Sequence, residues 1–330
     1  MTANENATVG DSRQTDATRM LRQRANEIGL LIGLIVLYLF LSFFAPNFFT
    51  VANQLNILRD AAFVGIIAWG MTFILIAGEI DISVGPHVAF AGVVLAKLAQ
   101  AGMPLPAAIV VVLLLGAAIG TVSGFLRARF DVPSFIVSLS LWLALRGIAE
   151  VISDAVPVMI MDIGFQRLGS GALLGVPIPA IIMMVGFVIF SYLANRTVLG
   201  RSVYAIGGNA EAARLSGIPV ARIRVIIFAI TGLLSALTGV LMASRLGSGN
   251  SGAATGLEFD VIAAVVVGGT SLFGGRGTML GTLLGVLFIA ALVNGLVLLG
   301  VDPFAQGIVR GFVILAAVMI NIISIKRVRG

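Results

Sequence analysis

The stretch "PLPAAIVVVLLLGAAIGTVSGFLRAR" (residues 104–129) carries no charged side chain before Arg127. A helix needs about 20 such residues to cross the hydrocarbon core of a bilayer. Three glycines recur at every fourth position, which puts them on one helix face: Gly116, Gly120 and Gly124. Small residues on one face let a second membrane helix approach closely. The stretch therefore predicts a membrane-spanning helix that packs through glycine and ends at a pair of cations, Arg127 and Arg129.

The whole chain repeats this apolar pattern. It is 59% hydrophobic and 11% charged, whereas soluble domains carry about 25% charged residues. We predict an all-α polytopic membrane protein with about ten transmembrane helices, of which the eighth is bracketed by glycine-rich sequence. The predicted spans are 28–44, 60–77, 84–101, 104–126, 133–153, 177–195, 222–244, 258–273, 278–299 and 304–324.

The cations indicate the orientation in the membrane. With the N-terminus in the cytoplasm, most arginines fall in cytoplasmic connections, and an even number of spans places both termini there. We expect cytoplasmic tails at 1–27 and 326–330, no cleaved signal peptide, and a single permease domain at 28–325. Although Lys and Arg (21) outnumber Asp and Glu (15), their position in loops between apolar runs indicates a lipid membrane as partner and no nucleic acid.

No catalytic or cofactor site is predicted. The chain has no cysteine, and His87 is its one histidine, so a metal centre or a catalytic triad has too few members. The chain also lacks the phosphate-binding pattern G-x-x-x-x-G-K-[ST]. Energy for transport must come from a partner or from an ion gradient, and we expect the chain to be no enzyme itself.

The longest cytoplasmic loop, 196–221, contains a short helix-forming segment. Asn209 is placed to cap a helix, Glu211 suits the positive end of its dipole, and Gly217 ends it. Such a helix, about two turns long, is marginally stable alone in water. It is either an ordinary basic loop that sets topology or a surface on which a partner docks.

Several stretches resemble the permease subunits of ABC importers of the ribose/arabinose/xylose type. "EAARLSG" (211–217) is similar to the core of their coupling helix, although the Leu-Pro of the longer consensus is missing. Further similar stretches, in the family's order between Pro46 and Arg310, are "PNFFT", "GEIDISVG", "YAIGGNAEAARLSGIPV", "ASRLGSG", "FDVIAAVVVGGTSLFGGRGT" and "NGLVLLGVDPFAQGIVRG". The "GGNAEAARLSG" and "DPFAQ" stretches favour this branch over branched-chain amino-acid permeases.

The resemblance implies a bacterial inner-membrane protein that works with other chains. Its expected partners are a separate ATP-binding cassette ATPase, a periplasmic sugar-binding protein, and a second permease that is identical or related. The implied substrate is a small sugar of the pentose, deoxyhexose or polyol class. The resemblance assigns contact with the ATPase to the coupling residues, which are Asn209, Glu211, Ala212, Ala213, Arg214 and Gly217.

Five polar residues are candidates for the translocation path or gate: Asp81, Ser83, Glu258, Asp260 and Asn294. Asp81 and Ser83 shape the path or cap the third helix. Glu258 and Asp260 face the path or the binding protein, or cap the eighth helix. Asn294 bonds either a neighbouring helix or a passing sugar. "GEIDISVG" (78–85) and "GLEFDVIAAVVVGG" (256–269) also open spans of opposite direction, which suggests an inverted repeat.

Five further residues need partners that the sequence does not settle. Glu79 stands where most members of the resembling family have an apolar or small residue, and His87 is either a packed residue or a ligand contact. Arg146 and Glu150 share a helix face and are expected to pair. Arg310 has no acid partner nearby in the sequence and is expected to anchor at the membrane surface or to dock the binding protein.

Two other classes of function remain as alternatives. An ion-coupled secondary transporter or channel for a small polar solute would need an acid deep within a span, whereas these acids fall near predicted span ends. An integral membrane enzyme would need clustered catalytic residues at one face, and the sequence has none.

Overall fold

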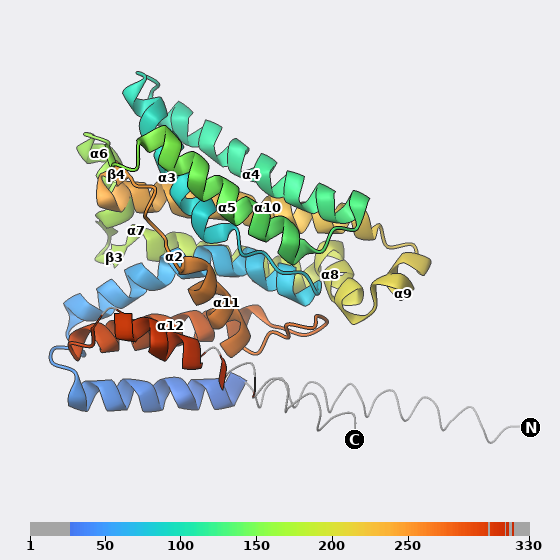
Figure 1. Ribbon diagram of the computed structural model, residues 1–330. Helices are drawn as coiled ribbons and strands as arrows, with labels where there is room; N and C mark the ends of the chain where they lie inside the picture. Colours follow the sequence, from blue (N-terminus) through green and yellow to red (C-terminus); the bar gives the residue numbers. More distant parts are fainter. Residues whose placement is uncertain (1–26, 303, 314, 317–318, 320–330) are drawn as a thin grey trace, which may run out of the picture.

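The computed structural model describes residues 27–302, 304–313, 315–316 and 319 (Figure 1). The predicted N-terminal tail lies outside the described residues except for Glu27, and the C-terminal tail lies outside them completely. The prediction of an all-α membrane protein is confirmed. Within the described residues, strands are limited to two-residue pairs, β1 (Val158–Met159) with β4 (Ser248–Gly249) and β2 (Ala172–Leu173) with β3 (Val176–Pro177), both antiparallel.

Among the described residues, seven helices are long and apolar enough to cross a membrane. They are Glu27–Phe44, α2 (Val51–Ile76), α4 (Leu105–Phe130), α5 (Ser134–Ser153), α7 (Ile178–Arg196), α10 (Val220–Leu246) and α12 (Met279–Leu298). Most match a predicted span within a few residues. The exception is α2, which begins nine residues before the predicted 60 because Thr50 caps it by accepting from the Asn53 amide (3.4 Å).

Two further apolar helices are shorter than these seven. α3 (Val84–Gln100) has 17 residues, and α11 (Leu257–Val267) has 11. At 1.5 Å per residue α11 is about 17 Å long, against a hydrocarbon core of about 30 Å. The predicted span 258–273 was therefore wrong at its end, because Gly268 and Gly269 (φ +88°) terminate the helix. The last predicted span, 304–324, is described as a helix over 304–313 and at 315, 316 and 319, so the structure does not establish ten spans.

Glycine packing joins α4 to α10, as the sequence predicted for the three glycines of α4. A Cβ on Gly120 would lie 2.9 Å from the carbonyl carbon of Phe228 and 3.0 Å from the Cα atom of Ala229. Gly116 and Gly124 meet Ala236 and Val225 of α10 in the same way. The two helices thus touch backbone to backbone along much of their length and form one rigid pair.

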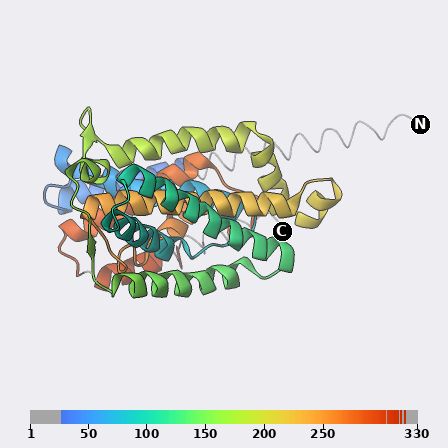
Figure 2. The ribbon, with the colours of Figure 1, turned by 90° about the horizontal axis from the view of Figure 1, so that it is seen from above.

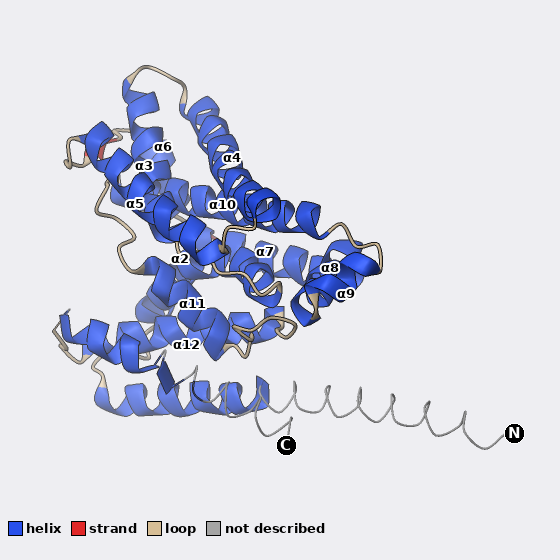
Figure 3. Ribbon diagram, turned by 45° about the vertical axis from the view of Figure 1, so that its right-hand side comes forward, coloured by secondary structure: helices blue, strands red, loops and turns tan. Residues whose placement is uncertain are grey.

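Among the seven long apolar helices, α2 is the most buried, and its Trp69 and Phe73 are completely enclosed. In Figure 3 it lies between the group α3, α4, α5 and α10 and the group α11 and α12. The connectors α8 (Val198–Gly208) and α9 (Ala210–Leu215) lie together at one end of the bundle, and α6 (Ile163–Ser170) lies at the other. The view in Figure 2 agrees with this, because the yellow α8–α9 segment projects beyond one end of the helices. We call this the α9 end.

Candidate functional site

The predicted helix in the 196–221 loop is present as α9. Asn209 caps it by accepting from the amides of Glu211 and Ala212, each at 3.0 Å. Gly217 has a φ of +82°, which a side chain disfavours, and the helix ends before it.

One face of α9 is open to solvent. Glu211 and Arg214 form an ion pair at 2.6 Å, and both side chains are nearly two-thirds exposed. Hydrogen bonds from the Arg214 guanidinium hold the pKa of Glu211 below its usual value. Leu215 is 75% exposed, whereas Ala213 is buried against the protein. α9 therefore presents a balanced charge pair and an apolar side chain on a helix of six residues, which needs packing partners for stability.

The end of α8 lies against the end of α2. A Cβ on Gly207 would fall 2.5 Å from the Gly275 amide nitrogen and 2.9 Å from the Ile76 carbonyl carbon. The Gly275 amide itself donates to the Ile76 carbonyl at 2.8 Å. Three backbone segments therefore meet at Gly207: the end of α8, the end of α2 and the loop that contains Gly275. Because Gly207 has no side chain, the chain just before α9 lies directly against the membrane helices.

Asp81 and Ser83 lie in the turn that begins α3. Oδ1 of Asp81 accepts from the Ser83 amide (2.9 Å) and hydroxyl (2.6 Å), and both residues are almost fully buried. The structure thus places these two path candidates together at the start of α3. Ser83 is the N-cap residue of α3, but its side chain makes no capping hydrogen bond there, so the capping interpretation is not confirmed for it.

Glu258 lies in the interior, at the start of α11. Its side chain is 1% exposed, and its Oε1 accepts from Nε1 of Trp142 at 2.9 Å. Trp142 is the ninth residue of the 20-residue α5, so this carboxylate lies near the middle of the bundle. Its Oε2 has no hydrogen-bond partner among the described residues.

The starts of α3 and α11 meet at Glu258. A Cβ on Gly85, the second residue of α3, would fall 3.0 Å from the Glu258 carboxyl carbon. From this junction α3 runs toward β4, next to which Gly92 and Val93 lie. α11 runs the other way, and the loop after it bonds the end of α2 at the α9 end. Two short helices that leave one point in opposite directions have the arrangement expected of an inverted repeat.

Other polar candidates have partners on distant elements. Asp260 pairs with Arg310 at 3.1 Å, so Arg310 has the acid partner that the sequence did not reveal. Arg146 donates to the backbone carbonyls of Ser251 and Ala253. The predicted pair of Arg146 with Glu150 was wrong, because the arginine is engaged by the loop between β4 and α11.

Asn294 is paired within the protein. It exchanges two hydrogen bonds with Asn53 of α2, each at 2.9 Å. This places it against a neighbouring helix, which was one of the two predicted environments. His87 is buried in α3 beside Gly116, and its Nε2 has no hydrogen-bond partner in the described part of the chain.

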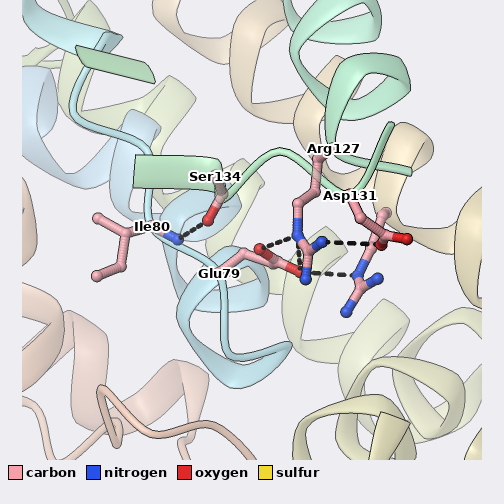
Figure 4. Close-up of polar contacts among 6 residues, drawn as sticks. Glu79, Ile80, Arg127, Asp131 and Ser134 are labelled. Carbon is pink, nitrogen blue, oxygen red and sulfur yellow. Dashed lines mark hydrogen bonds and ion pairs between the residues drawn. The ribbon is translucent and has the colours of Figure 1, made fainter. Parts of the chain in front are cut away.

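A buried ionic group at the α9 end was not assembled from the sequence. We call Glu79, Arg127, Asp131 and Arg224 the inner charge cluster. The Glu79 carboxylate accepts from Nε of Arg127 at 3.0 and 2.9 Å (Figure 4), and Nε of Arg224 lies 2.7 Å from its Oε1. Arg127 also contacts Asp131 at 3.3 Å. Glu79 is 3% exposed, and Asp131, at the edge, is 89% exposed.

The inner charge cluster joins three segments. Glu79 belongs to the non-helical stretch 77–83 between α2 and α3, Arg127 to the last turn of α4, and Arg224 to the start of α10. The Ile80 amide donates to Oγ of Ser134 at 3.1 Å, which adds the start of α5 (Figure 4). The sequence signal for this cluster is an acid next to a glycine in a loop, Glu79 after Gly78, whereas the pattern of the arginines along the chain indicates only the orientation in the membrane.

A multi-pass helical bundle with two short apolar helices and an exposed helical connector suits a membrane permease. A family model described as "Branched-chain amino acid transport system / permease component" matches residues 53–318. The chain belongs to this family of permease components.

Similar proteins carry more specific descriptions. "Probable ABC transporter permease protein YphD" of Escherichia coli (strain K12) is 55% identical over 94% of this chain and 93% of that protein. "Ribose import permease protein RbsC" of Bacillus subtilis (strain 168) is 44% identical over 89% of this chain and 92% of that protein. "L-arabinose transport system permease protein AraH" of Escherichia coli (strain K12) is 39% identical over 90% of each chain. The resemblance to sugar-type ABC permeases is thereby confirmed. No solved structure matches the chain significantly.

Proposed function

We propose that this chain is the membrane permease of an ATP-driven importer that takes up a small sugar delivered by a periplasmic binding protein. The observation that carries the proposal is the near full-length similarity to ribose and arabinose permeases. Although the family description names branched-chain amino acids, these two relatives are described as sugar permeases. The chain works as a pair of identical or related permeases in the bacterial inner membrane, with both termini in the cytoplasm.

The α9 segment is the docking site for the ATPase in this proposal. Its exposed Glu211, Arg214 and Leu215 supply polar and apolar contacts. Asn209 and Gly217 fix its two ends, and Ala213 packs it onto the permease. Closure of the ATPase dimer on ATP would displace α9 and switch the path between outward and inward access.

The path passes the junction of α3 and α11. Glu258 supports this assignment because its Oε2 is a buried acceptor without a partner, and sugar hydroxyls are donors that can fill it. Asp81, Ser83 and Asp260 act as positioning groups around this junction, through their contacts with the α3 start and with Arg310. Asn294 of α12 bonds Asn53 of α2 and fixes the position of these two helices relative to each other beside the path.

Ion coupling is the second candidate. It is supported by Glu258, which is buried, whereas Asp260 is partly exposed and pairs with Arg310. The relatives described as a ribose import permease and an arabinose transport permease favour the ATP-driven function.

A pull-down from native membranes in gentle detergent tests the proposal. A P-loop ATPase that co-purifies with the chain, and is lost when Gly217 is replaced with Val or Glu211 with Lys, would support it. The matched control is Glu150→Lys. Glu150 is an exposed acid near the C-terminal end of α5, so this variant should keep the ATPase bound. A folded chain that purifies without any ATPase would refute the ATP-driven importer. Uptake of labelled pentoses compared with labelled leucine then decides the substrate class.

A further inference from the structure

The stretch 77–83 is held by charge as well as by packing. It is not helical, and it connects α2 to the start of α3. Both oxygens of Glu79 lie within 3.0 Å of Nε of Arg127, which donates to both, while Nε of Arg224 approaches Oε1. Because the carboxylate is nearly excluded from water, these attractions are weakly screened. A displacement of Arg127 and Arg224 therefore also displaces Glu79 and the stretch 77–83.

The two arginines belong to the part of the molecule nearest to α9. α10 begins at Val220, three residues after Gly217 ends the α9 segment. Arg224 follows about one helical turn later. The glycine contacts between α4 and α10 make Arg127 move with Arg224. A shift of α9 thus reaches Glu79 through one short connection and one rigid helix pair.

The stretch 77–83 in turn leads to the proposed path. Two residues after Glu79, Asp81 bonds Ser83 at the start of α3. Gly85 of α3 then touches Glu258 at the junction of the two short helices. From Glu79 to this junction the chain spans only six residues, all described.

We propose that Glu79 is the positioning residue that carries the displacement of α9 to the stretch 77–83 and hence to the start of α3. This inference rests on the proposed function, because it takes the ATPase as the source of the displacement. Without the ionic tie, α10 still moves with nucleotide, but the α2–α3 stretch no longer follows it.

The absence of cysteine from the chain allows a direct test in the complete permease–ATPase assembly. Single cysteines are introduced at Ile80, which is half-buried in the stretch, and at Ala221, which is exposed at the start of α10. The maleimide labelling rate of each is measured without nucleotide and with ATP plus vanadate. With Glu79 present, both rates should change with nucleotide. In the Glu79→Gln background, the change at Ile80→Cys should be lost and the change at Ala221→Cys should persist.

Two further variants distinguish transmission of motion by Glu79 from a purely structural role of this residue. The double variant Glu79→Gln/Arg224→Gln removes one negative and one positive charge, and Arg127 remains paired with Asp131. It should therefore fold even if Glu79→Gln alone does not. Its labelling at Ile80→Cys should still fail to respond to nucleotide. The control Asp154→Asn makes the same chemical change at an exposed carboxylate and should leave both responses intact.

Three outcomes would overturn the inference while leaving the importer intact. The first is a nucleotide response at Ile80→Cys that survives Glu79→Gln. The second is a nucleotide response at Ile80→Cys that returns in the Glu79→Gln/Arg224→Gln variant. The third is the lack of a nucleotide response at either cysteine when Glu79 is present. If no ATPase assembles with the unmodified chain, the proposed function fails first, and this inference falls with it.

Discussion

Replacing Gly120 with Ala should loosen the α4–α10 pair that carries two arginines of the inner charge cluster. The new Cβ would lie 2.9 Å from the Phe228 carbonyl carbon and 3.0 Å from the Ala229 Cα atom, whereas carbon atoms pack at about 3.5–4.0 Å. The helices must separate by roughly 0.5–1 Å, because both obstacles are backbone atoms. Overpacking of this kind costs about 1–3 kcal/mol.

Gly147→Ala is the matched control for this change. Gly147 is also within a membrane helix, but a Cβ there meets nothing within 4 Å. Both variants gain the helix propensity of alanine, about 1 kcal/mol, so their difference isolates the overpacking. Equilibrium unfolding in mixed detergent micelles should therefore rank Gly120→Ala below Gly147→Ala by about 1–3 kcal/mol. Equal stability of the two variants would refute close backbone contact between α4 and α10.

Three further changes test other contacts. Gly207→Ala should reduce uptake with little loss of protein from the membrane, because its Cβ would collide with the backbone at the end of α2; wild-type uptake would contradict that contact. Trp142→Phe should destabilise the protein by about 1–3 kcal/mol by removing the donor to buried Glu258, and an unchanged unfolding midpoint would count against the bond. Asn53→Leu and Asn294→Leu should each cost about 1–3 kcal/mol, but the double variant less than their sum; strict additivity in a double-mutant cycle would exclude the pair.

The membrane helices and α9 could be predicted from the sequence because their signals are local. Apolar length gives a span, and Asn209 and Gly217 mark helix ends by their own conformational preferences. The end of α11 was missed because hydropathy continues past Val267, although Gly268 and Gly269 stop the helix. Length and apolarity cannot distinguish a full span from a half helix.

The partners of charged residues could not be predicted from neighbouring sequence. Arg310 finds Asp260 fifty residues away, and Arg146 prefers carbonyls more than a hundred residues away to the acid one turn along its own helix. In each case tertiary packing brings together groups that share no periodicity. The inner charge cluster escaped prediction for the same reason, since its four members come from three separate segments.

The two buried glutamates differ in a way that suits different roles. Both oxygens of Glu79 face guanidinium groups, and removing one partner of a buried ion pair costs about 3–5 kcal/mol. Such a carboxylate does not exchange partners readily, which is what a permanent mechanical tie requires. Glu258 has one hydrogen bond, and its Oε2 has no partner among the described residues. A hydrogen bond to a charged group contributes about 1.5–3 kcal/mol net, which is less than the cost of breaking the ion pair at Glu79. In the proposed path, Glu258 can therefore accept from a passing hydroxyl and release it. If the proposed importer receives its sugar from a selective binding protein, we expect weaker contacts of this kind along the path and stronger ones where motion is transmitted.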